Sequence, residues 1–173
     1  DGKLLKFRAK AMPECQFAAP QPDVQIVFEP LPGTDAQLSQ TDYDVVRLTQ
    51  IAGSGVYNLL DMGDTSQLPA NPNHYRLKLP DGSIYSITQG VGLTQVSEPD
   101  GNTLTYTPSG IHHSRGQDIT FLRDNLGRIE QVVLPDGRRR NYRYTPAGDL
   151  EMALDTGLDV TSFTYVPQAP HYL

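Results

Sequence analysis

Serine, histidine and aspartate side chains in the middle of the chain are of the types that a hydrolytic site needs. Ser109 or Ser114, with His113 and Asp118, would supply a nucleophile, a base and a group that orients the base. The sequence lacks the contexts that place a catalytic serine, such as the Gly-x-Ser-x-Gly turn after a strand. We therefore predict no catalytic residue and no enzymatic activity.

Histidines near the same aspartate raise the question of a metal site. His112, His113 and Asp118, with the more distant His74, are ligand types for zinc. Adjacent residues of a strand point to opposite faces, so His112 and His113 are poorly placed to bind one ion. Surface histidines beside a turn are the simpler interpretation, and no metal is predicted.

Other possible ligand sites also have plain structural readings. The repeated Asp81, Asp100 and Asp136 follow prolines, where an aspartate ordinarily accepts hydrogen bonds from nearby backbone N–H groups and does not build a calcium cage. Cys15 is the only cysteine, which excludes an internal disulfide. Gly53-Ser54-Gly55 lacks the helix that must follow a phosphate-binding loop, so we predict a flexible turn and no cofactor.

Arginines and tyrosines alternate near the C-terminal end in a pattern that nucleic-acid grooves also use. If the segment is a strand, one face carries Arg138, Arg140, Tyr142 and Tyr144. The opposite face carries Arg139 and Arg143. The chain has 14 Lys and Arg against 20 Asp and Glu, a net charge of −6 that repels phosphates. We predict a solvated strand with acidic cross-strand partners that protects a sheet edge, and no nucleic-acid binding.

Two short signatures recur along the chain and indicate a repeat architecture. Pro-Asp-Gly occurs at 80–82, 99–101 and 135–137, and Tyr-Thr-Pro-x-Gly at 106–110 and 144–148. Proline sets φ for the first corner of a type I turn, and glycine supplies the left-handed residue that follows. Each signature therefore predicts a tight hairpin with a glycine bulge. The predicted structural turn residues are Pro80, Asp81, Gly82, Pro99, Asp100, Gly101, Pro108, Gly110, Gly127, Pro135, Asp136, Gly137, Pro146 and Gly148.

The segments between the turns have the composition of strands. Tyr75, Leu77 and Leu79 alternate with basic residues, which places the apolar side chains on one face. We predict an all-β fold, an antiparallel meander of short hairpins, over residues 74–173, and a divergent β segment with loops over 1–73. The predicted strands are 3–8, 24–28, 43–50, 55–60, 75–79, 83–88, 102–107, 117–122, 128–134, 138–144 and 159–165.

The length of 173 residues suits one ordinary domain or two small ones, and 38% hydrophobic residues predict a lean core. No apolar run is long enough for a membrane-spanning helix, and no secretory leader is recognisable. The sequence begins without Met and stops in what looks like a strand, so we expect it to be a piece of a longer protein.

The set of motifs resembles the RHS, or YD-repeat, proteins. The resemblance is carried by Gly101 to Tyr106, Asp124-Asn125-Leu126-Gly127-Arg128, Pro135-Asp136-Gly137 and Tyr142-Arg143-Tyr144. It covers residues 74–173, with a faint extension toward Asp1. The usual Tyr-Asp stands here as Tyr106-Thr107 and Tyr144-Thr145, and Phe121 replaces a tyrosine.

This resemblance implies a curved or spiralling sheet that is part of a hollow β-shell. Such shells enclose a toxin segment in bacterial members of the family and serve adhesion in animal teneurins. The implied setting is secreted or at the cell surface, and the implied partners are the remainder of the parent array and an encapsulated toxin domain. Neither a toxin domain nor a cleavage site is expected within this chain, and no membrane insertion.

Three functions are compared: a structural shell segment, which ranks first, an adhesive module that binds cell-surface glycans, and an enzyme, which ranks last because no set of catalytic residues converges. The tyrosines distinguish the first two, because rings packed between strands favour a scaffold and a row exposed in a groove favours sugar binding. The series to be located is Tyr85, Tyr106, Phe121, Tyr142, Tyr144, Phe163 and Tyr165.

Overall fold

A computed structural model describes residues 4–14, 23–50, 57–61, 68–157 and 159–165. These residues form fifteen strands, all paired antiparallel, and no helix, which confirms the predicted all-β meander. In the same residues no helix has the length and apolar character needed to cross a membrane. Backbone contacts divide the chain into two compact units, 1–103 and 104–173. The predicted organisation into 1–73 and 74–173 stays a prediction.

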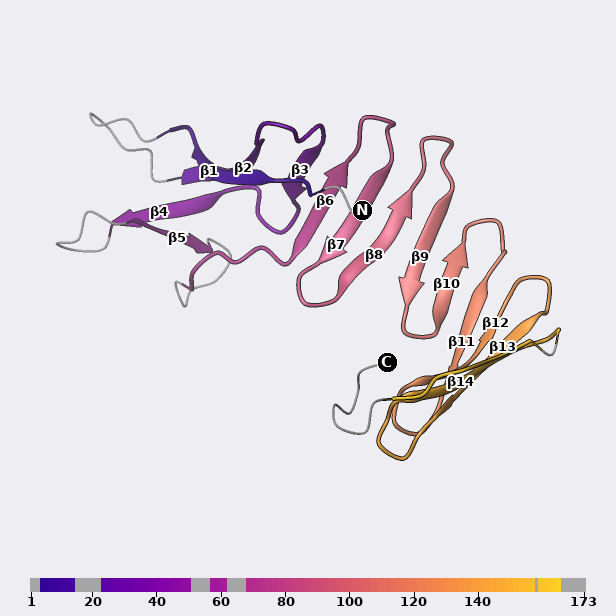
Figure 1. Ribbon diagram of the computed structural model, residues 1–173. Coiled ribbons are helices and arrows are strands. Elements are labelled where there is room, and N and C mark those ends of the chain that lie inside the picture. The colour runs from indigo at the N-terminus through magenta and orange to yellow at the C-terminus, as the bar shows by residue number, and fades with distance from the viewer. Residues whose placement is uncertain (1–3, 15–22, 51–56, 62–67, 158, 166–173) are drawn as a thin grey trace. The chain divides into compact units, whose positions relative to one another are not determined.

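The first unit contains two sheets (Figure 1). One sheet has the strand order β1-β2-β4-β5. In the other sheet the strands of this unit follow the order β3-β6-β7-β8. Its strands are β1 (Phe7–Met12), β2 (Asp23–Pro30), β3 (Gln37–Gln40), β4 (Val46–Gln50), β5 (Tyr57–Asp61), β6 (His74–Lys78), β7 (Ile84–Thr88) and β8 (Gly92–Ser97).

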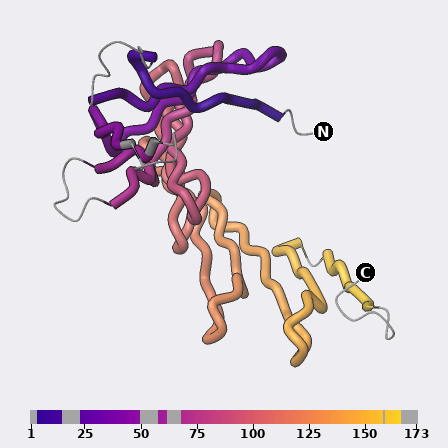
Figure 2. The backbone as a smooth tube through the Cα atoms, turned by 90° about the vertical axis from the view of Figure 1, so that its left-hand side faces the viewer, coloured from indigo at the N-terminus to yellow at the C-terminus, as the bar shows by residue number. Residues whose placement is uncertain are grey.

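The second unit is one sheet of consecutive hairpins, which Figure 2 follows from orange to yellow. Neighbours in sequence are neighbours in the sheet throughout, so the strand order is the chain order. Its strands are β9 (Thr103–Thr107, whose first residue belongs to the first unit), β10 (Gly110–His113), β11 (Ile119–Arg123), β12 (Ile129–Val133), β13 (Arg139–Tyr144), β14 (Leu150–Asp155) and β15 (Val160–Ser162).

Five hairpins share one turn geometry. In each, the N–H of the glycine donates to the carbonyl of the residue three positions earlier, as Gly137 N does to Leu134 O (2.9 Å). The N–H of that earlier residue donates to the carbonyl of the residue after the glycine, as Leu134 N does to Arg138 O (2.8 Å). This is the predicted type I turn with a glycine bulge. The five turns span 79–83, 98–102, 124–128, 134–138 and 145–149, and their glycines have φ between +81° and +99°.

The core is small and lies in the first unit. Four apolar residues are buried among those that the structure describes, Val24, Ala36, Val46 and Val96, and Val24 pairs directly with Val46 across β2 and β4. Among the described residues of the second unit, every apolar side chain is half-buried or exposed. The prediction of a lean core is confirmed.

Several strand boundaries differ from the prediction for identifiable reasons. The strand predicted from residue 43 begins at Val46, because the side chain of Gln40 accepts the backbone N–H groups of Asp42 and Tyr43 and holds a turn there. The strand predicted at 3–8 is Phe7–Met12, since its register with β2 starts at Phe7.

Four strands were not predicted: β3, β8, β10 and β14. The sequence of β14, Leu-Glu-Met-Ala-Leu-Asp, contains no β-branched residue, and its pairing on both sides with β13 and β15 overrides its local preference.

Candidate functional site

A hydroxyl, an imidazole and a carboxylate form a hydrogen-bonded chain in the second unit. Thr107 Oγ1 lies 3.2 Å from His112 Nε2, and His112 Nδ1 lies 3.0 Å from Asp118 Oδ2. The hydroxyl of Ser109 is 2.9 Å from Thr107 Oγ1. We call Thr107, His112 and Asp118 the hydroxyl–imidazole–carboxylate relay.

The hairpin β9–β10 places the first two relay residues on one face. The short turn at 108–109 sets Thr107 opposite Gly110 and His112 opposite Thr105. Because side chains alternate along a strand, Thr107 and His112 then project on the same side. Asp118 lies in the turn that leads into β11, outside this hairpin, and its carboxylate bonds to the ring of His112.

Asp118 is held as an ionised acceptor. The hydrogen bond from the His112 ring and then the one from the backbone N–H of His113 (3.1 Å) hold the pKa of Asp118 below its ordinary value. An ionised carboxylate only accepts hydrogen bonds, so the Nδ1 of His112 carries a proton. In the neutral ring Nε2 then presents a lone pair to Thr107.

The triad considered from the sequence, Ser109 or Ser114 with His113 and Asp118, is not formed in the structure. His113 meets Asp118 through its backbone, and its ring Nδ1 accepts the N–H of Arg115 at 3.0 Å. The histidine that contacts the carboxylate through its ring is His112. Its pairing with Thr107 could have been found from strand alternation about the 108–109 turn.

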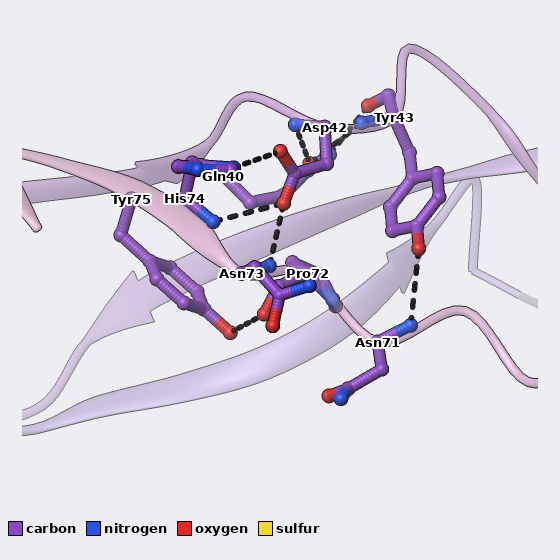
Figure 3. Close-up of polar contacts among 8 residues, drawn as sticks. All are labelled: Gln40, Asp42, Tyr43, Asn71, Pro72, Asn73, His74 and Tyr75. Carbon is purple, nitrogen blue, oxygen red and sulfur yellow. Dashed lines mark hydrogen bonds and ion pairs between the residues drawn. The ribbon is translucent and has the colours of Figure 1, made fainter. Parts of the chain in front are cut away.

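A second histidine–aspartate pair lies in the first unit, where the chain enters β6 (Figure 3). His74 Nδ1 is 2.6 Å from Asp42 Oδ1, while Oδ2 of the same carboxylate accepts the backbone N–H groups of Asn73 and His74. Partial burial alone would raise the pKa of Asp42, but the hydrogen bonds from His74 and Asn73 outweigh it and lower that pKa.

Tyrosines on either side complete this corner. The hydroxyl of Tyr75 donates to Pro72 O (2.8 Å), and the hydroxyl of Tyr43 accepts the N–H of Asn71 (3.4 Å). The group thus ties the segment after β3 to the start of β6, which is a structural task. His74 is in the other unit from His112 and His113, and the described residues contain no cluster of three metal-ligating side chains.

The arginine-rich strand β13 is an interior strand. It pairs with β12 on one side and β14 on the other, so the expectation that it protects a sheet edge is wrong. Arg140 meets the expectation of an acidic cross-strand partner, since its Nη2 lies 3.0 Å from Asp155 Oδ2. Arg138 precedes the strand and pairs with Asp136 within the same turn (2.6 Å).

Two tyrosine hydroxyls donate to the backbone of the neighbouring strand. Tyr144 donates to Ile129 O (2.7 Å), and Tyr165 donates to Leu150 O (2.9 Å). The guanidinium of Arg128 also lies over the Tyr144 ring, 4.4 Å from its centroid, while its Nη2 pairs with Asp124. These rings tie each strand to the one before it.

Four other aromatic residues of the predicted series lie opposite aliphatic residues. Tyr85 is flanked by Leu77 and Val96 in register, and Phe121 lies opposite Val132. Tyr106 lies opposite Ile111 and Tyr142 opposite Ala153. All of these aromatic side chains are half-buried.

One open groove of about 390 Å³ lies in the second unit. It contains a single aromatic residue, Tyr142, beside a Gln131–Asn141 amide hydrogen bond of 2.7 Å. The groove therefore offers no row of exposed rings. Gly53-Ser54-Gly55 and Cys15, considered above as possible sites, lie outside the described residues.

The chain was compared with known proteins. No protein-family model matches it, and no curated protein matches it.

Proposed function

We propose that this chain is a non-enzymatic structural segment of the β-shell of a large secreted or cell-surface protein of the RHS type. Its main partner is the remainder of the parent array, and an enclosed toxin domain is the second. The proposal rests on the motif resemblance together with the repeated turn, which reverses the chain with the same two backbone hydrogen bonds in five hairpins.

The observation that carries the proposal is the uncovered sheet of the second unit. Its described residues include no buried apolar side chain, although Ile111, Phe121, Val132 and Tyr142 are all half-buried. A sheet normally buries one face against another layer to gain stability. A wall segment receives that cover from the rest of the shell or from the cargo inside it.

Neighbouring turns support the same role. A Cβ added to Gly82 would meet Pro99 Cγ at 3.3 Å, so the 79–83 and 98–102 turns pack against each other at one edge. The tyrosine hydroxyls of Tyr144 and Tyr165 are used within the sheet, which favours a wall over an adhesive module that binds sugars.

The two functions are separated by a glycan array and by the dye ANS, which fluoresces on exposed apolar surface. A wall segment removed from its cover binds ANS strongly and gives no saturable glycan signal. Specific glycan binding that is abolished by Tyr142→Ala, in a variant that keeps the wild-type melting temperature, would replace the scaffold by the adhesive module.

A further inference from the structure

We propose that the hydroxyl–imidazole–carboxylate relay makes Thr107 a nucleophile that accepts acyl groups from activated carboxylic esters. This reaction is a single acylation of the chain itself, without turnover, so it is a modification site beside the non-enzymatic role proposed above and does not depend on that role. The assignments are Thr107 Oγ1 as the attacking atom, His112 Nε2 as the general base and Asp118 as the residue that positions the imidazole.

The order of atoms is the first argument. A base must reach the hydroxyl with one ring nitrogen while the other is fixed by a carboxylate. His112 does so, with Nε2 at 3.2 Å from Thr107 Oγ1 and Nδ1 at 3.0 Å from Asp118 Oδ2. Both separations suit proton transfer through a hydrogen bond in a resting site.

The second argument is that the carboxylate is itself fixed. Asp118 Oδ1 accepts the backbone N–H of His113 at 3.1 Å while Oδ2 faces the ring. The imidazole is thereby held in one orientation, with its basic nitrogen toward Thr107. The Asp42–His74 pair has a similar carboxylate–imidazole contact, but no hydroxyl of the described residues bonds to its second ring nitrogen, and the pair serves as an internal comparison.

Access is the third argument. His112 and Asp118 have side chains 42% and 44% exposed, and Ser109, 2.9 Å from Thr107, is also exposed. A small ester can therefore approach the Thr107 hydroxyl from solvent. In the resting structure the Thr107 hydroxyl donates to Gly110 O (3.2 Å), so its proton turns to His112 Nε2, which is 3.2 Å from Thr107 Oγ1, before the attack.

The step balances without any further reactant. Thr107 Oγ1 attacks the ester carbonyl carbon as His112 Nε2 takes its proton, and the bond between that carbon and the leaving oxygen breaks. The alcohol leaves as its anion and takes the proton back from His112. The product is an ester of Thr107, and no atom changes oxidation state.

The test uses p-nitrophenyl acetate with the whole chain and peptide mass spectrometry to place the acetyl group. We expect one acetyl on Thr107 and a matching release of p-nitrophenol. Thr107→Val should abolish labelling at this position, and His112→Gln should slow it on the order of a hundredfold, the usual contribution of a general base.

Controls separate the relay from a folding effect. His74→Gln removes the other histidine–aspartate pair and should leave labelling of Thr107 unchanged. Asp118→Asn should slow labelling in the wild-type background but not further in His112→Gln, because Asp118 acts through that ring. Circular dichroism of every variant checks that the sheet is retained.

Two outcomes would overturn the proposal. One is an acetyl group confined to histidine, lysine or Ser109 side chains, with none on Thr107. The other is labelling of Thr107 at the same rate in folded His112→Gln as in the wild type, which would show an ordinary surface hydroxyl.

Discussion

Gly110 and Gly137 both have positive φ, but different constraints act on them. At Gly137 (φ +83°) an added Cβ would meet no atom within 4 Å. At Gly110 (φ +154°) the same Cβ would lie 2.1 Å from the backbone oxygen of Ile119 on the neighbouring strand. The first glycine is required by backbone conformation alone, and the second also by the close approach of β11.

Gly137→Ala should therefore lower the free energy of unfolding by about 1–2 kcal/mol, the cost of a left-handed conformation for an L-residue. Gly110→Ala should cost more than about 4 kcal/mol, because the strands must separate to admit the methyl group. Urea unfolding of the two variants measures both values. Equal costs would contradict the close approach of β11 at Gly110.

Tyr144 allows a test of the tyrosine hydrogen bonds that join neighbouring strands. Tyr144→Phe keeps the ring under Arg128 and removes only the hydroxyl that donates to Ile129 O. We expect a loss of about 0.5–1.5 kcal/mol, the net value of one hydrogen bond. The matched control is Tyr142→Phe, since no hydroxyl hydrogen bond of Tyr142 is found among the described residues. A larger effect in the control would refute this role of Tyr144.

At the scale of the element, the turn at 134–138 depends on an ionised aspartate. The backbone N–H of Arg138 donates to Asp136 Oδ1 (3.0 Å) and its Nε to Oδ2 (2.6 Å), and these bonds, in that order, lower the pKa of Asp136. The stabilisation is therefore present above the ordinary pKa of 3.8 and is lost as the pH falls through the lower pKa of the folded state.

Asp136→Asn should consequently lower the melting temperature at neutral pH, and the difference from wild type should shrink in acid. Melting curves recorded from neutral pH to below pH 3.8 give this difference directly. Arg138→Ala keeps the backbone N–H and should show a smaller effect of the same sign. A difference that grows in acid would contradict the assigned role of the carboxylate.

At the scale of the whole molecule, the edge strand β15 is the feature that bears on association between copies of the chain. Among the described residues β15 is an edge strand that pairs with β14 alone, and its Val160 is 54% exposed. An exposed sheet edge is a template for pairing with another chain. We therefore expect self-association at high concentration, which light scattering measures.

Val160→Lys should reduce this self-association, because a charge on an edge strand opposes pairing. Val91→Lys is the matched control: Val91 is 74% exposed but lies in the turn between β7 and β8, away from a sheet edge. It should leave the association unchanged. A wild-type chain that stays monomeric at all concentrations would exclude this use of β15.

Local sequence was enough to predict the five bulged turns, but the prediction for 106–110 is wrong, because Gly110 is paired with Thr107 as the first residue of β10 and forms no bulge. Each Pro-Asp-Gly turn is specified within five residues by the fixed φ of proline, the carboxylate that accepts a nearby N–H and the glycine in the left-handed region. These interactions involve no distant partner. For the same reason β11, β12 and β13 lie close to their predicted ranges.

What the sequence determined by itself is the repeated reversal of the chain and the all-β class, because φ preferences and side-chain alternation act between near neighbours. Tertiary structure decided that β3 pairs with β6, that β14 is a strand, and that His112 rather than His113 turns its ring to Asp118. Those outcomes depend on which strands meet and in which register, and contacts between residues far apart in the chain set both.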